Sequence, residues 1–215
     1  MEILISIVLL VLLSFVLYSK KNTKKRNVKN MHDRRKGSYK ANSDVVIGVE
    51  WLATLDFRTC LVCGVLDGTR YKVKGPKPKV PAHDNCRCLY LPVTELSDCI
   101  EAKRPAEMLP TAFLAEQRYN SENHKKRFDE LASSTQKKYF YAEQKILSEK
   151  GIEVYKQVNW SYRQWFAKLP KKYQRIILGD ERFEIMVKHD LKLEDFVNIE
   201  EMREYTLTEL YQKWH

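Results

Sequence analysis

Four cysteines and one histidine in a short stretch of the chain have the spacing of metal ligands. Cys60 and Cys63 form a C-x-x-C motif, and after 19 intervening residues His83, Cys86 and Cys88 form an H-x-x-C-x-C motif. A tight turn directs two thiolates separated by two residues at one centre, and two such turns supply the four ligands of tetrahedral zinc. The sequence predicts a zinc site of Cys60, Cys63, His83 and Cys86, with Cys88 as the alternative fourth ligand.

Three other uses of the cysteines compete with this prediction. They could form disulfides in an oxidising compartment, be inert buried thiols, or act as a redox C-x-x-C pair. A thioredoxin-type redox motif needs a βαβ context, which the sequence does not indicate. Cys99 lies outside both motifs and is interpreted as a lone thiol.

Polar residues near the motifs have structural uses. The Asp-Gly pair at 67 and 68 predicts a hairpin turn, because Gly adopts positive φ without a steric penalty. A carboxylate or guanidinium beside the cysteines can hydrogen-bond the turns around a metal. An active-site carboxylate is the alternative role for Asp56. The residues expected to shape the site or its turns are Asp56, Asp67, Gly68, Asn85 and Arg87.

The N-terminal segment is apolar on every face. Residues 3–17 contain only two serines as polar interruptions, and Glu2 is the only charge before them. A secretory signal would begin with a basic region, so the pattern predicts an uncleaved transmembrane anchor over residues 1–18, contacting the membrane through residues 3–18.

A basic segment follows. Residues 19–40 carry ten Lys or Arg against Asp33 alone, which accounts for +9 of the net charge of +10. The positive-inside rule then predicts a single-pass membrane protein with its N-terminus outside and its bulk in the reducing cytoplasm, where zinc is favoured over disulfides. Residues 20–40 could also attract nucleic acid or anionic lipid, whereas residues 41–215 are nearly balanced, with 28 basic and 26 acidic residues.

The expected fold class is α+β, with an N-terminal transmembrane helix, a small zinc-stabilised β-rich module and a C-terminal helical region. Strands are predicted within residues 45–53, 69–73 and 88–91, joined by an irregular proline-rich loop at 74–81. The predicted segments are an anchor (1–18), a basic linker (19–44), the zinc module (45–98), a helical segment (99–158) and a small helical module (159–215).

Fifteen residues of the cysteine region resemble the C-terminal domain of the phage Mu protein F-like minor head (head morphogenesis) proteins. They are Trp51, Thr54, Asp56, Cys60, Cys63, Leu66, Asp67, Gly68, Pro81, His83, Asn85, Cys86, Arg87, Cys88 and Pro92. A second block that begins W-S-Y-R-Q-W-F at Trp160 resembles the tail that follows this domain. Together the two blocks cover residues 45–214. Family members carry a long helical region before the cysteine domain, and here an apolar segment and a basic linker stand in its place.

The resemblance implies a prophage-derived structural protein of capsid morphogenesis, associated with portal or capsid proteins and located in the virion if the anchor is an artefact of truncation. The alternative is a membrane-anchored zinc-binding interaction module. A zinc-site nuclease is disfavoured, because a site closed by four protein ligands leaves no position for a reactive water. The sequence therefore predicts no enzyme and no small-molecule substrate.

Overall fold

The computed structural model describes residues 31–97, 102–122 and 124–214. It is an α+β structure that divides into unit 1 (Met1–Glu50 and Arg70–Ser97) and unit 2 (Trp51–Thr69 and Asp98–His215). The chain leaves unit 1 within strand β1 (Gly48–Leu52) and returns at Arg70. Each unit therefore combines two stretches that are separate in the sequence.

A three-stranded sheet with the order β2-β1-β3 confirms the three predicted strands. The first two are shorter than expected, and the third begins and ends later than expected. Strand β2 is Arg70–Tyr71 and β3 is Leu89–Val93. Strands β1 and β2 are antiparallel, with Val49 opposite Tyr71. The predicted loop at 74–81 contains no helix or strand, as expected of a segment with three prolines.

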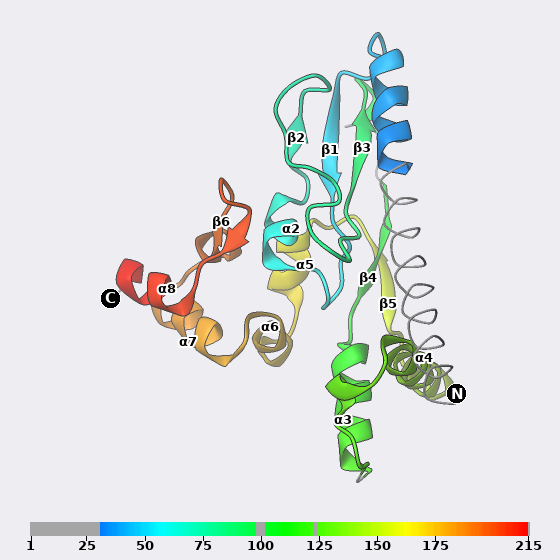
Figure 1. The fold of residues 1–215 in the computed structure, drawn as a ribbon, viewed down its shortest axis with the longest axis vertical. Helices are drawn as coiled ribbons and strands as arrows, with labels where there is room; N and C mark the ends of the chain where they lie inside the picture. Colours follow the sequence, from blue (N-terminus) through cyan, green and yellow to red (C-terminus); the bar gives the residue numbers. More distant parts are fainter. Residues whose placement is uncertain (1–30, 98–101, 123, 215) are drawn as a thin grey trace, which may run out of the picture. The chain divides into compact units, whose positions relative to one another are not determined.

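Residues 31–41 form a helix rather than the irregular linker that their basic composition suggests. In unit 1 this helix runs beside the sheet (Figure 1). Its residue Tyr39 packs on a small core of Val46, Val49 and Val73. The Tyr39 hydroxyl also donates a hydrogen bond to the carbonyl of Tyr90, at 3.0 Å. One partly buried aromatic ring therefore anchors an otherwise polar helix.

Unit 2 contains a two-stranded antiparallel sheet of β4 (Arg104–Glu107) and β5 (Tyr155–Val158) within the segment predicted to be helical. Leu55 forms a bridge with Ala106, which extends this pairing to the stretch before the first cysteine. Neither R-P-A-E nor Y-K-Q-V has the apolar alternation that signals a strand. Pro105 donates no backbone hydrogen bond, a property tolerated at a sheet edge.

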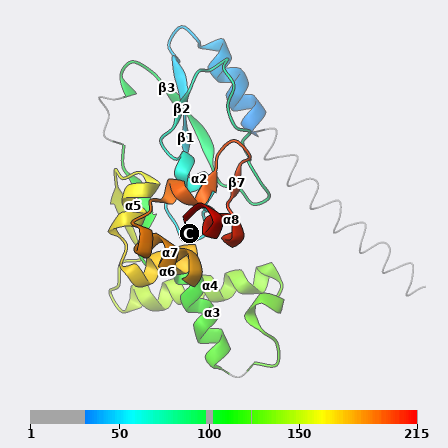
Figure 2. The ribbon, with the colours of Figure 1, turned by 90° about the vertical axis from the view of Figure 1, so that its left-hand side faces the viewer.

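Helices make up most of unit 2. Helices α3 and α4 pack against each other (Figure 2), and Arg118 of α3 binds Glu143 of α4 at 2.5 Å. Trp165, Tyr162, Phe196 and Leu210 are completely buried. The α-helices are α2 (Leu61–Leu66), α3 (Thr111–Ser121), α4 (Ser133–Glu149), α5 (Tyr162–Lys168), α6 (Lys171–Leu178), α7 (Asp180–His189) and α8 (Leu207–Trp214). Shorter elements are the 3-10 turns η2 (Phe128–Glu130) and η3 (Leu193–Phe196) and the strands β6 (Val197–Asn198) and β7 (Arg203–Glu204).

The residues that cap or follow three helices define where those helices end. Gly151 follows α4 with φ of 71°, as expected of a residue just after a helix. Thr206 and Glu209 form a capping box, in which the Glu209 carboxylate accepts from the Thr206 N–H at 2.7 Å. Asp180 is the first helical residue of α7, and Gly179 is the N-cap.

The structure corrects the membrane part of the predicted fold class. Among residues 31–97, 102–122 and 124–214, no helix is long and apolar enough to cross a bilayer. The 17-residue helix α4 is interrupted by charged residues, including Lys137, Lys138 and the buried Glu143. The predicted anchor, residues 1–18, lies outside the described residues. The predictions of a transmembrane protein and of single-pass membrane localisation are therefore withdrawn.

Candidate metal centre

The first cysteine pair lies at the start of α2. Cys60 is the N-cap of this helix, and its sulfur accepts a hydrogen bond from the backbone N–H of Cys63 at 3.5 Å. Cys63 is 1% exposed and Cys60 is half-buried. The C-x-x-C motif is therefore folded into the first turn of a helix.

Helix α2 is held in unit 2 by side chains that bind its backbone. The indole nitrogen of Trp51 donates to the carbonyl of Cys63 at 3.2 Å, and Arg163 donates to the carbonyl of Val65 at 2.6 Å. Gly64 faces the ring of Tyr162 so closely that an added Cβ would lie 2.4 Å from the ring carbons. The sequence around the second cysteine thus requires a glycine, because a completely buried aromatic ring covers this point of the helix.

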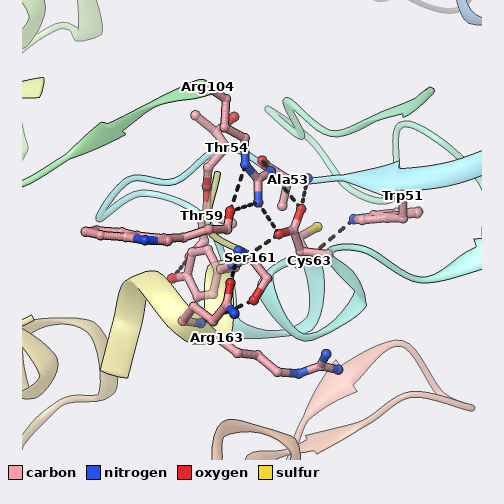
Figure 3. A network of polar contacts seen from close by, with 12 residues as sticks. Trp51, Ala53, Thr54, Thr59, Cys63, Arg104, Ser161 and Arg163 are labelled. Atoms are coloured by element: carbon pink, nitrogen blue, oxygen red, sulfur yellow. Dashed lines mark hydrogen bonds and ion pairs between the residues drawn. The ribbon is translucent and has the colours of Figure 1, made fainter. Parts of the chain in front are cut away.

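Asp67, at the end of α2, is the centre of a polar network. Figure 3 labels two of its partners, Ala53 and Arg104. Its carboxylate accepts from the backbone N–H groups of Ala53 and Tyr162, both at 2.8 Å. Arg104 makes a bidentate ion pair with it, with one bond of 2.9 Å. Arg104 also donates to the carbonyls of Ala53 and Trp160, both at 2.8 Å. This network ties the cysteine helix to β4 and to the start of α5.

The second motif is a turn in unit 1. The N–H of Cys86 donates to the carbonyl of His83 at 3.2 Å, and Asn85 has a φ of 63°. Cys88 is buried and directly precedes β3. The Nδ1 atom of His83 lies 2.9 Å from the carbonyl of Asp84. If Nδ1 carries the proton and donates to that carbonyl, Nε2 presents its lone pair to a metal.

Two overlapping groups of donor atoms result. The donor atoms of Cys60, Cys63 and His83 all lie within 4.8 Å of one another, and so do those of Cys63, Cys86 and Cys88. These residues lie close enough to hold a metal ion. Cys63 belongs to both groups, and the sulfurs of Cys86 and Cys88 both lie within 4.8 Å of its sulfur, so both remain candidate ligands.

The remaining predicted residues occupy turns. Asp56 accepts from the N–H of Arg58 at 3.0 Å and from the hydroxyl of Thr59 at 3.1 Å, which shapes the turn just before Cys60. Gly68 has a φ of 82°, and its N–H donates to the carbonyl of Trp51 at 2.8 Å. Arg87 is exposed. Cys99 lies outside the described residues.

Sequence reasoning missed Glu107, a carboxyl group buried at the end of β4. It accepts from the N–H groups of Phe57 at 3.4 Å and Thr111 at 3.3 Å, and from the hydroxyl of Thr111. Burial is the main cause of its raised pKa, and the nearby Asp56 raises it further, whereas these hydrogen bonds lower it. Its local sequence is that of an ordinary surface glutamate, so no signal marked it.

Sequence reasoning also missed His32, because it lies in the segment interpreted as a linker. Its ring is half-buried, and burial followed by the charge of Arg35 lowers its pKa. Cys86 has the opposite effect on this pKa. The helix of residues 31–41 therefore contributes a second imidazole to the surroundings of the H-x-x-C-x-C turn.

Comparisons with protein-family models, curated proteins and solved structures returned no match. The resemblance to Mu F-like head proteins therefore stays a prediction from motifs.

The donor atoms of the site fit one class of ion best. Four sulfurs and one imidazole nitrogen are ligands that borderline and soft metals prefer, whereas Mg²⁺ and Ca²⁺ prefer oxygen. A centre with four protein ligands stabilises the surrounding chain and leaves no coordination position for substrate. What this arrangement can do chemically is to cross-link two turns of the chain through a metal.

Proposed function

We propose that Cys60, Cys63, His83 and the Cys86/Cys88 pair hold a structural zinc ion, and that the chain is a structural component of phage head morphogenesis. The convergence of the two cysteine motifs on Cys63 is the observation that carries the zinc proposal. The donor set supports zinc because thiolate and imidazole are the ligands of its structural sites. The Nδ1 contact of His83 agrees with metal binding through Nε2.

A bound metal would stabilise the fold of unit 1, whose hydrophobic core is small. The buried apolar side chains in the described part of unit 1 are few, namely Val46, Val49, Val73, Cys88 and Val93, and three tyrosines pack around the first three of them. Such a small core stabilises a fold weakly, and in small domains a bound zinc contributes on the order of 10 kcal/mol. We therefore expect the folding of the cysteine motifs to depend on the metal.

The test measures zinc content and thermal unfolding of the full chain, purified under reducing conditions. We expect about one zinc per chain, and a fall in Tm when a chelator removes it. Cys63→Ser should abolish stoichiometric zinc, since this residue belongs to both donor groups. Cys99→Ser, which alters a cysteine outside both motifs, is the matched control and should retain zinc. If the purified protein contained no metal and its Tm did not change with chelator, the proposal would be overturned.

The single variants Cys86→Ser and Cys88→Ser then assign the fourth ligand. The true ligand is the one whose replacement lowers zinc affinity further, and cobalt substitution reports the number of thiolates through its absorption spectrum. If both single variants bound zinc as tightly as the unchanged chain, neither Cys86 nor Cys88 would be the required fourth ligand, which would contradict the assignment.

The head-morphogenesis role rests on the quoted motifs in two separate blocks of the chain. A tagged full-length chain, expressed in cells that assemble heads from the same genetic element, should co-sediment with capsid particles. Recovery of particles without the tagged chain would overturn this role and leave the zinc proposal intact.

A further inference from the structure

The excess positive charge of the chain belongs entirely to unit 1. The sequence of unit 1 contains 16 basic and 6 acidic residues, whereas unit 2 contains 22 of each. The net charge of +10 therefore comes from unit 1 alone. A neutral unit and a strongly basic unit in one chain differ in the partners that they attract, because clustered like charges create a long-range potential.

Six lysines in the described part of unit 1 form what we call the lysine face. They come from the helix of residues 31–41 and from the segment between β2 and β3. Five of them are exposed, and Lys77 is half-buried. The lysine face consists of Lys36, Lys40, Lys72, Lys74, Lys77 and Lys79.

Hydrogen bonds fix the two segments to each other. The Tyr39 hydroxyl of the helix donates to the carbonyl of Tyr90, and the Tyr90 hydroxyl donates to the carbonyl of Pro78 at 2.9 Å. The Lys77 ammonium donates to the carbonyls of Lys72, Val73 and Gly75, at 3.1, 2.6 and 3.2 Å. The loop therefore has a defined shape beside the helix.

The ammonium group of Lys77 lies close enough to those of Lys36 and Lys40 to be repelled by them. Burial lowers the pKa of Lys77, and the charges of Lys36 and Lys40 lower it further. Among the residues that the structure describes, no carboxylate lies within ion-pair distance of any lysine of this face, whereas Arg70 nearby in the sequence pairs with Glu50 at 2.8 Å. An anion bound here would relieve this repulsion, because opposite charges attract the same groups that repel one another.

We propose that the lysine face binds the phosphate backbone of nucleic acid without reading its sequence. Lysine is depleted in the cores of protein interfaces, whereas nucleic-acid interfaces are polar and rich in positive charge. Lysine ammonium groups contact phosphates as point charges and carry no base-specific information. The lysine face shares no residue with the donor groups of the metal centre, and it combines lysines of the helix of residues 31–41 with lysines of a loop that is distant in the sequence.

The experiment measures binding of the full chain to a fluorescent 30-base-pair DNA duplex across a range of salt concentrations. The loop variant is Lys72→Gln, Lys74→Gln and Lys79→Gln together. The control variant is Lys137→Gln, Lys138→Gln and Lys150→Gln together, which removes the same charge from exposed positions of the neutral unit. Both variants should keep the Tm and zinc content of the unchanged chain.

We expect the logarithm of the binding constant to fall linearly with the logarithm of salt concentration, by about 0.9 per phosphate contact. The loop variant should reduce this slope by about 2 to 3 and weaken binding at least tenfold at low salt, while the control changes affinity less than twofold. Duplexes of different sequence should bind equally.

Equal effects of the two variants, or no binding of the unchanged chain, would overturn the proposal. Equal or tighter binding of polyglutamate would also overturn it, in favour of an acidic protein partner. The zinc content of the loop variant distinguishes this proposal from the zinc proposal, because the variant retains all five candidate metal ligands and should bind zinc normally even if it loses DNA binding.

Discussion

Asp67 and Arg104 form an ion pair that brings the end of the cysteine helix α2 to strand β4, 37 residues further along the chain. The Asp67 side chain is 1% exposed, and that of Arg104 is 19% exposed. A buried carboxylate is stable only when its oxygens are paired, and here two backbone N–H groups and the guanidinium satisfy it.

Asp67→Asn should therefore be strongly destabilising. Removing the charge of one partner leaves the Arg104 guanidinium poorly compensated, and breaking a buried pair lowers the free energy of unfolding by about 3 to 5 kcal/mol. Urea unfolding of the zinc-loaded chain measures this change. Glu50→Gln, which breaks the more exposed pair with Arg70, is the control, and its expected effect is about 1 kcal/mol or less. Equal losses from the two variants would contradict the central role of Asp67.

Gly64→Ala tests the packing of Tyr162 on α2. The new methyl group would overlap the Tyr162 ring, and overpacking of this kind lowers stability by about 1 to 3 kcal/mol. Gly37→Ala is the matched control, because Gly37 is helical and has no atom within 4 Å of an added Cβ. The control should be neutral or slightly stabilising, since alanine favours helices. A tolerated Gly64→Ala would show that the ring moves freely.

Glu107→Gln should change how stability depends on pH. Because burial raises the pKa of Glu107, the folded state binds its proton more tightly than the unfolded state does. The free energy of unfolding contributed by this group therefore falls as pH rises above the ordinary glutamate pKa of about 4.3, until the folded pKa is passed. The variant should lack this fall. Unfolding measured from pH 4 upward checks it, and identical pH profiles would exclude the effect.

Thr206→Ala removes the hydroxyl that caps α8. This hydroxyl accepts from the N–H of Glu209 at 3.3 Å, and loss of such a cap lowers stability by about 1 kcal/mol. Thr208→Ala, inside the same helix, should leave stability unchanged or raise it slightly. The difference between the two Tm values is the measurement, and a larger loss from Thr208→Ala would contradict the capping assignment.

The sequence was informative where the physics is local. Prolines indicated the loop at 74–81, and a glycine occupies the position just after α4. The capping-box spacing of Thr206 and Glu209 indicates the start of α8. The metal motifs were recognisable because ligands from one turn are close in sequence. The donors from both motifs do converge, which the spacing alone could suggest but not establish.

Long-range pairings left no local signal. The partner of Asp67 is an arginine in a segment predicted to be helical, and Glu107 resembles any surface glutamate until the fold buries it. Tyr39 looked like one residue of a basic linker, although its ring completes the small core of unit 1. These roles depend on which segments meet, and that information is distributed over the whole chain.

The packing of Tyr162 on α2 also determines when α2 can complete its folding during translation. Its hydroxyl reaches the carbonyl of Thr59 across 103 residues of chain. While the ribosome is still making the intervening segment, helix α2 exists without the ring that later packs on Gly64. The C-x-x-C pair should therefore reach its final backbone geometry only after Tyr162 has been synthesised.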